Sequence, residues 1–274
     1  MKKRLCLAAL MLACVSLLSA CGAEASAALM KSGASGTLRI TDVLWQRSYL
    51  SSDNRVTLGS YSYTLPSMTD ETGDAAQAKI ADAFNAGVET MANRNIREWD
   101  SAMEDAEDYY NSLSSGEWSF EKSGWTDQIT YEMSRTDGLV SLRYAHYSYA
   151  GGAHGYTDYT SQLFDLQEGK FITLAALAED AGALKETVAE EILRQIDENH
   201  LAVSYGYWSD YATYVDQWMD AYSTYFNEDG ALEVIFPAYE LASYAAGAQA
   251  FTVSQEVYAP CLNDYGRQLL GNSQ

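Results

Sequence analysis

The chain has 274 residues, with 38 acidic against 17 basic ones and a formal net charge of −21 at pH 7. A surface this acidic repels nucleic acids and other anionic polymers and attracts cationic partners. The sequence therefore predicts no nucleic-acid partner, and beyond the N-terminal segment it has no apolar run long enough to cross a bilayer.

Residues 1–20 have the layout of a secretory signal peptide. Residues 1–4 are cationic, and residues 5–20 are apolar or small almost throughout, which is short for a membrane span. The segment ends in LSAC, residues 18–21, which resembles the lipobox of bacterial lipoproteins, where the cysteine is acylated and becomes the first mature residue. We expect removal of residues 1–20, lipid on Cys21, and an extracytoplasmic protein anchored to the bacterial cell membrane. The alternative is an ordinary signal peptide in which the cysteine occurs by chance.

Cysteine usage agrees with this assignment. Cys6 and Cys14 lie in the segment expected to be removed, so Cys261 is the thiol left in the folded part, and one thiol cannot form an internal disulfide. We expect it to be buried and inert. Residues 21–36 are mostly small and lack periodicity, as in a flexible tether. Loss of three basic residues with the signal gives the mature chain a net charge of −24.

The remaining residues, about 240, suffice for one large domain or two small ones. Residues 37–45 and 55–65 alternate like strands. Residues 74–114 predict a helix whose apolar positions recur every three or four residues. Further strands are expected at 128–136, 138–149 and 156–166, with a turn at Asp137-Gly138.

The C-terminal part continues the mixed pattern. Residues 182–200 form an amphipathic helical pattern, and an aromatic stripe predicts a second helix over 208–225. Late strands are expected within 230–236 and 249–257. Long helices together with hairpin-connected strands indicate an α+β fold of two modules, 37–147 and 148–274, each an antiparallel sheet covered by helices.

The stretch YAGGAHGY, residues 149–156, places one histidine among three glycines. Gly151, Gly152 and Gly155 are expected to supply positive φ or a close backbone approach between two strands. In one interpretation His154 only forms a hydrogen bond across this turn. In the other, Tyr149, His154 and Tyr156 present polar tips at a ligand-binding edge, with the three glycines as part of the same site.

Two segments carry a family resemblance. Residues 147–178 resemble a signature Tyr-x-Tyr-Thr-Gly-Gly-Ala-His-Gly followed by Phe-Asp-Leu-x-x-Gly-Lys and Leu-Thr-Leu, and FPAYELASYAAGAQAFTV resembles the closing segment of the same family. This is similar to the extracytoplasmic domain family of unknown function shared by the sigma-V anti-sigma factor and the N-terminal region of a peptidoglycan deacetylase. Ala150 stands where the family has threonine, and Ser243 where it has proline.

The resemblance implies binding. Neither the paired aspartates and His-x-x-x-His motif of the deacetylase relatives nor the transmembrane helix of the anti-sigma relatives occurs in the sequence. In the anti-sigma branch the partner is C-type lysozyme, a strongly basic protein. We therefore expect a non-catalytic surface lipoprotein that binds a lysozyme-like cationic protein or a cell-wall glycan.

Direct inspection predicts no catalytic residue, cofactor or metal. The histidines lie in no His-Glu-x-x-His motif, and no Gly-x-Ser-x-Gly elbow is found. Two alternatives stay open. His146, His154 and Asp158 would form a loose metal site if the glycine loop joins two strands, and the protein would then be an envelope hydrolase or a metal-dependent enzyme using His154.

The acylation site generates a first prediction. Changing Cys21 to Ser removes the sulfur that carries the lipid, so we expect the protein to leave the membrane fraction on cell fractionation, because the acyl chains supply the anchoring free energy. Changing Cys14 to Ser is the control and leaves the distribution as it was. Firm membrane association of the Cys21 variant would place the anchor elsewhere.

Overall fold

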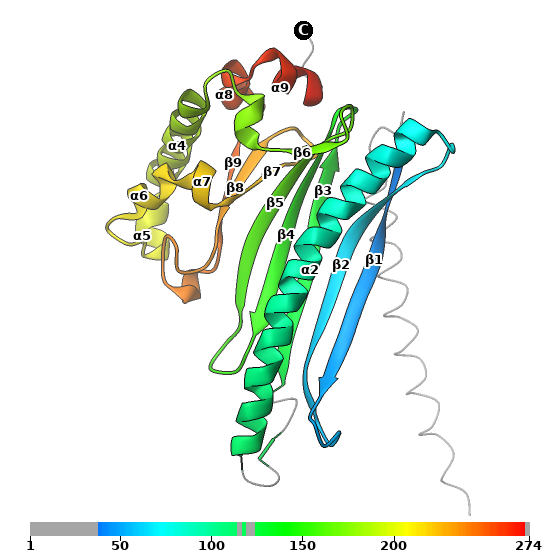
Figure 1. Ribbon diagram of the computed structural model, residues 1–274. Helices are drawn as coiled ribbons and strands as arrows, with labels where there is room; N and C mark the ends of the chain where they lie inside the picture. Colours follow the sequence, from blue (N-terminus) through cyan, green and yellow to red (C-terminus); the bar gives the residue numbers. More distant parts are fainter. Residues whose placement is uncertain (1–37, 114–116, 119–123, 272–274) are drawn as a thin grey trace, which may run out of the picture. The chain divides into compact units, whose positions relative to one another are not determined.

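The computed structural model describes residues 38–113, 117–118 and 124–271 (Figure 1). The expected signal peptide, the acylation site Cys21 and the tether at 21–36 lie outside the described residues. Within the described part, no helix combines the length and the apolar character that a membrane span requires.

The larger sheet has six strands in the order of the chain. All neighbouring strands are antiparallel except β2 and β3, which are parallel. The strands are β1 (Leu38–Leu50), β2 (Thr57–Asp70), β3 (Trp125–Arg135), β4 (Leu139–Tyr149), β5 (Tyr156–Asp165) and β6 (Lys170–Ile172). The expectation of a purely antiparallel sheet was wrong at this one pair. Parallel neighbours need a long crossover, and the helix between β2 and β3 supplies it.

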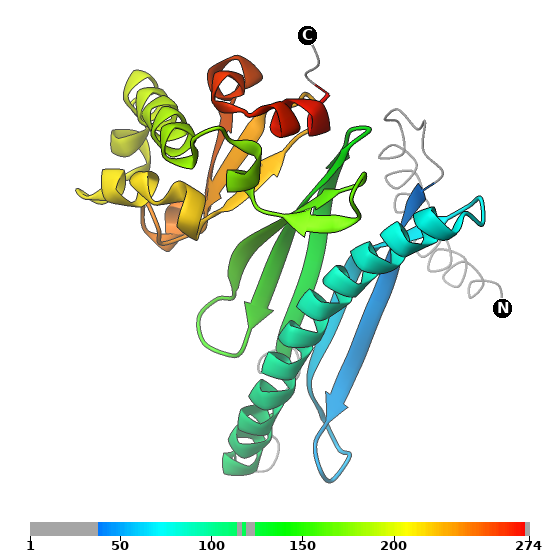
Figure 2. The ribbon, with the colours of Figure 1, turned by 45° about the horizontal axis from the view of Figure 1, so that its top comes forward.

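That crossover is α2 (Ala75–Ser112), a helix of 38 residues that runs along one face of the sheet (Figures 1 and 2). Asp74 caps its start by accepting hydrogen bonds from the backbone N–H groups of Ala76 and Gln77. Its apolar stripe, as the periodicity predicts, is buried at Phe84, Val88 and Met91 and packs on inward-facing residues of β2 to β5. This layer forms the first core.

The smaller sheet is antiparallel and has its own core. It consists of β7 (Ser223–Phe226), β8 (Leu232–Phe236) and β9 (Gln249–Val253). The predicted stripe of α4 (Ala181–Glu198) packs on it together with Trp218. Short helices complete the layer: α5 (Leu201–Tyr205), α6 (Tyr211–Asp216), α7 (Trp218–Ala221), α8 (Gln255–Tyr258), α9 (Asp264–Leu269), and the 3-10 turns η1 (Leu174–Leu177), η2 (Tyr244–Ala246) and η3 (Ala259–Cys261). The α+β class is confirmed.

Two expectations differ from the structure in detail. The helix predicted over 208–225 is divided into α6 and α7 and ends before β7, because residues 223–226 pair with β8 instead of continuing the helix. The predicted module boundary at 147/148 falls inside β4, and the division into two modules stays a prediction. Cys261 is half-buried, with its Sγ atom 3.5 Å from the hydroxyl of Thr187.

Serine hydroxyls join the two sheets. The edge strand β7 lies against β4 and β5, and its outward N–H groups donate to side chains of the larger sheet: Phe226 to Ser141 Oγ at 2.9 Å and Thr224 to Ser161 Oγ at 3.1 Å. The hydroxyl of Ser134 donates in turn to the carbonyl oxygen of Phe226. Unpaired backbone groups of a buried edge are costly, and these serines satisfy them without a shared backbone ladder.

Replacing Ser141 with Ala tests this joint. The change leaves the buried N–H of Phe226 without an acceptor, so we expect the free energy of unfolding to fall by about 1–3 kcal/mol in urea denaturation. Ser148 lies on the same strand, and its hydroxyl has no hydrogen-bond partner within the described ranges, which makes Ser148→Ala the matched control. Equal effects of the two changes would contradict a special role for Ser141.

Candidate functional site

The glycine motif forms the connection between β4 and β5. Gly151 and Gly152 have φ angles of +88° and +91°, a region that favours glycine. At Gly155 a Cβ atom would lie 2.4 Å from the ring of Tyr147, so this position needs the small residue for close packing. Both roles that the sequence predicts for the glycines are therefore found in the loop.

His154 lies flat against Tyr244, with ring centroids 3.7 Å apart and planes inclined by 14°. Its Nδ1 is 3.0 Å from the carbonyl oxygen of Gly155, and its Nε2 is 3.2 Å from the hydroxyl of Tyr239. A carbonyl oxygen only accepts hydrogen bonds, so Nδ1 donates to Gly155, while Nε2 shares its hydrogen bond with the hydroxyl of Tyr239. Both ring nitrogens of His154 are thus engaged in hydrogen bonds.

This contact brings two distant motif segments together. The hydroxyl of Tyr244 donates to Gly155 O at 2.9 Å, and that of Tyr149 donates to Gly152 O at 3.0 Å. Residues 149–156 and 236–248 therefore form one surface, although 79 residues separate them in the chain.

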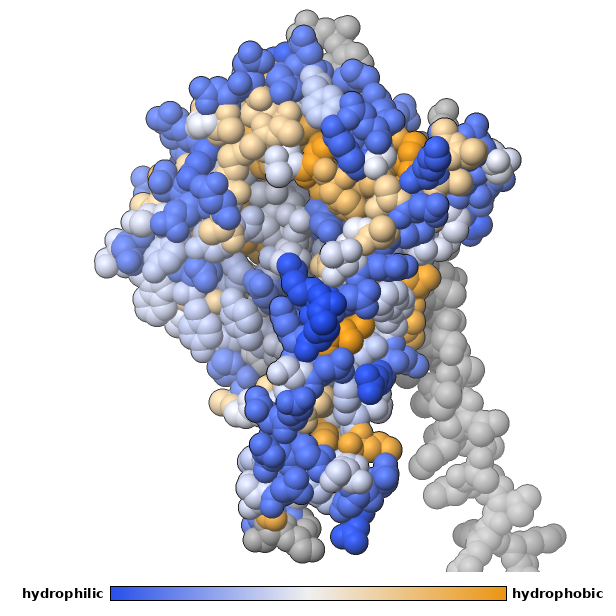
Figure 3. Space-filling view, viewed as in Figure 1, coloured by the Kyte–Doolittle hydropathy of each residue, from blue (hydrophilic) through white to orange (hydrophobic). Residues whose placement is uncertain are grey.

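Exposed aromatic rings extend this surface. Tyr239 is 48% exposed and has a φ of +77°, which is strained for a tyrosine. The indole of Trp208, 40% exposed, donates to Tyr239 O at 3.1 Å. We call His154, Trp208, Tyr239 and Tyr244 the aromatic surface. Figure 3 shows pale side chains of intermediate hydropathy where Figure 1 draws α5, α6 and the segment after β8.

Carboxylates lie beside the aromatic surface. Tyr156 is half-buried, and burial together with the charges of Asp158 and Glu240 raises the pKa of its hydroxyl. Glu240 accepts a hydrogen bond of 2.6 Å from Tyr222. The three predicted tips are thus placed differently: His154 is at the surface, Tyr156 is half-buried, and the hydroxyl of Tyr149 is bonded within its own loop. Their role in ligand binding stays a prediction.

The three-residue metal site is not assembled. His146 and Asp158 face each other in register on β4 and β5, while His154 is stacked on Tyr244 in the loop. Among the residues that the structure describes, no group of three or more His, Cys, Asp or Glu side chains is placed to hold a metal ion.

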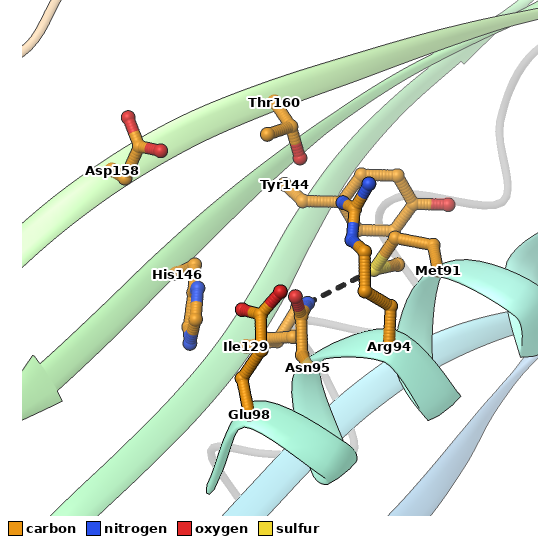
Figure 4. A pocket seen from close by; sticks show the side chains of 9 residues that line it. All are labelled: Met91, Arg94, Asn95, Glu98, Ile129, Tyr144, His146, Asp158 and Thr160. Carbon is orange, nitrogen blue, oxygen red and sulfur yellow. Dashed lines mark hydrogen bonds between the residues drawn. The ribbon is translucent and has the colours of Figure 1, made fainter. Parts of the chain in front are cut away.

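His146 instead belongs to a polar pocket between α2 and the strands β3 to β5. The pocket has a volume of about 240 Å³ (Figure 4). Its lining residues come from all four elements: Met91, Arg94, Asn95, Glu98, Ile129, Tyr144, His146, Asp158 and Thr160. Motif reading of the sequence missed most of these residues.

Two hydrogen-bonded groups, Asp127 and Tyr63, hold His146 on the side away from the pocket. Its Nε2 lies 2.7 Å from Oδ1 of Asp127, which is only 3% exposed. The other oxygen of Asp127 accepts a hydrogen bond from Tyr63 on β2. Burial, then the hydrogen bond and the charge of Asp127, raise the pKa of Tyr63, so this hydroxyl stays protonated and donates.

Two family models match the chain. Residues 52–157 match the model described as "Deacetylase PdaC", and residues 177–256 match the model described as "Protein of unknown function (DUF3298)". The glycine loop falls in the first match and the segment 237–248 in the second, so the aromatic surface is built from both. The resemblance seen in the sequence is confirmed.

Solved structures agree on the fold. A DUF3298 family member from Bacteroides fragilis superposes with a TM-score of 0.63 at 14% identity, covering 86% of this chain and 97% of its own. A DUF3298 family protein from Pseudomonas aeruginosa gives a TM-score of 0.50 at 15% identity, covering 85% and 97%. At this identity the likeness concerns the fold alone. The comparison with curated proteins gave no match.

The support of His146 can be tested at Tyr63. Tyr63→Phe removes a hydrogen-bond donor from the buried carboxylate of Asp127, and we expect the free energy of unfolding to drop by about 1–3 kcal/mol. Tyr61→Phe is the control, because the ring of Tyr61 lies against that of Tyr63 on the same strand and its hydroxyl has no partner among the described residues. Urea denaturation of both variants measures the difference, and a Tyr63 variant as stable as the control would show that the bond contributes little.

Proposed function

We propose that this protein is an extracytoplasmic lipoprotein, anchored through Cys21, that binds a cationic protein through the aromatic surface. Lysozyme-like cell-wall hydrolases are the first candidates, and a cell-wall glycan is the alternative ligand. The observation that carries the proposal is the stack of His154 on Tyr244, which joins the motif segments of both matched domains at one exposed place.

The composition of this surface supports a contact role. Tyrosine and tryptophan are enriched at binding sites because they bring large contact area and lose little side-chain entropy. Hydrogen bonds to the rings and to the loop backbone hold Trp208, Tyr239 and Tyr244 in place before any partner arrives. The strained backbone of Tyr239 is typical of functional positions, where surrounding contacts hold an unfavourable conformation.

Charge supports a cationic partner. The chain carries a net charge of −21, and Glu240 and Asp158 lie near Tyr156 beside the aromatic surface. Complementary charge steers diffusional encounter and raises the association rate more than the affinity. Sugar rings also stack on flat aromatic faces, so the same surface suits a neutral glycan.

An enzyme using His154 has less support. A general base needs a free ring nitrogen within reach of substrate, whereas both nitrogens of His154 are hydrogen-bonded to Gly155 and Tyr239. A metal would compete with the same two bonds.

Binding of C-type lysozyme to the full-length protein, held in detergent and measured by surface plasmon resonance, tests the proposal. Tyr239→Ala removes an exposed ring near the centre of the surface, and we expect the Kd to rise by about 30-fold, as for a hot-spot residue of about 2 kcal/mol. Tyr109 on α2 is similarly exposed, 46% against 48%, so Tyr109→Ala is the matched control and leaves the Kd unchanged. Neither change should shift the thermal midpoint by much.

Salt provides the second arm of this experiment. The reach of the electrostatic field falls from about 10 Å at 0.1 M to about 3 Å at 1 M ionic strength, so the association rate should fall as salt is added. Absence of lysozyme binding at low salt would overturn the cationic-protein assignment. Binding of a chitin oligomer that depends on Tyr239 would then favour the glycan.

A further inference from the structure

The residues that line the pocket beside α2 lie at two levels along the helix axis, which we call tiers. This arrangement follows from the geometry of a helix packed along strands. Four residues of helix advance about 6 Å, and two residues of strand advance about 6.7 Å. Arg94 on α2 therefore lies level with Tyr144 on β4, and Glu98 lies level with His146. The register of β5 adds Thr160 opposite Tyr144 and Asp158 opposite His146.

Charge is divided between the two tiers. The guanidinium of Arg94 lies toward the Tyr144 end, and the carboxylates of Glu98 and Asp158 lie toward the His146 end (Figure 4). Over the described ranges, none of these three charged side chains forms an ion pair. Arg94 and Glu98 stand four residues apart, a spacing at which opposite charges commonly pair, as Arg194 and Glu198 do on α4.

The floor of the pocket contains a buried amide with incomplete hydrogen bonding. Asn95 is 9% exposed, and among the described residues the only hydrogen bond of its side chain is from Nδ2 to the thioether of Met91, at 3.4 Å. Sulfur of this kind is a weak acceptor, and buried amides are normally satisfied by oxygen or nitrogen partners. Figure 4 shows the amide directed into the pocket, between Arg94 and Glu98.

We propose that this pocket binds a small zwitterion, either a free amino acid or a dipeptide whose two charged termini reach both tiers. Its carboxylate would contact Arg94 and the amide N–H of Asn95, and its ammonium group would contact Glu98 and Asp158. His146, held by Asp127 at 2.7 Å, fixes the wall at the ammonium end. Met91, Ile129 and Tyr144 provide apolar contacts for a short aliphatic side chain.

Ligands of one charge fit less well. A simple carboxylate would leave Glu98 and Asp158 unpaired and would be repelled by them, and a simple amine would lie beside the cation of Arg94. A volume of about 240 Å³ is below the range of about 300–1,000 Å³ for drug-sized ligands, which indicates a molecule of a few heavy atoms. The aromatic surface takes no part in this site, so the inference stands independently of the proposed function.

Isothermal titration calorimetry of the full-length protein in detergent provides the test. L-valine is the probe, and its two matched analogues are isovalerate, which lacks the amine, and isobutylamine, which lacks the carboxylate. We expect one L-valine bound per chain and affinities at least about tenfold weaker for each analogue, the factor equivalent to losing one charged contact. The dipeptide valyl-valine distinguishes the sources, because tighter binding than L-valine would identify a dipeptide as the ligand.

Variants tie the binding to the pocket. Arg94→Gln should weaken the binding of L-valine by about tenfold or more. It should also reduce the preference of the protein for L-valine over isobutylamine. Arg97 is also exposed on α2 but does not line the pocket, so Arg97→Gln is the control and binds as the parent does. Equal binding of L-valine and its analogues, no binding of L-valine or the dipeptide, or an Arg94 variant that binds like the control would each overturn the inference.

Discussion

The position of β7 against the larger sheet is the constraint on which the rest of the fold depends. An edge strand presents a row of backbone donors and acceptors, and here Ser134, Ser141 and Ser161 satisfy them with hydroxyl groups. This arrangement joins two sheets without merging their ladders. Because β8 pairs with β7 and ends at Phe236, the joint also directs the following segment, residues 237–244, toward the loop between β4 and β5. Without it, Tyr239 and Tyr244 would not meet His154.

The alternation of side chains along β4 and β5 separates the two sites. Successive residues of a strand point to opposite faces, so Ser141 and Ser161 face β7 while His146 and Asp158 face α2. His154 lies beyond the end of β4, where the alternation stops and the glycines set the backbone. Two histidines eight residues apart thus reach different environments: His146 lines a walled pocket behind a buried carboxylate, and His154 belongs to an exposed aromatic cluster.

Periodicity made the long elements predictable from the sequence. The apolar stripes of α2 and α4 are buried where the spacing of three and four residues places them. The glycine loop connects two strands, as predicted, and its turn uses the positive φ angles that Gly151 and Gly152 adopt easily. The aromatic stripe at 208–225 led to the prediction of one helix, which was wrong. Trp218 is buried in the helix α7 and Tyr225 in the strand β7, so a pattern of buried aromatic residues does not distinguish a helix from a strand here. The order of the strands could not be predicted from the sequence either, because no local pattern indicates that β2 and β3 are parallel neighbours. The hydrogen bonds that join Tyr63, Asp127 and His146 across β2, β3 and β4 depend on that order.

Asp158 connects the two sites electrostatically. Its side chain lines the pocket beside α2, yet its charge also contributes to the raised pKa of Tyr156 at the start of β5, after burial and together with Glu240. A raised tyrosine pKa means that nearby negative charge disfavours the phenolate, so Tyr156 stays a neutral hydrogen-bonding group next to the aromatic surface. A positive group placed beside Asp158 would offset part of that negative charge and would reduce the attraction of this edge for a cationic partner. The β4–β5 hairpin therefore carries residues of both places, and the charge of Asp158 acts at each of them.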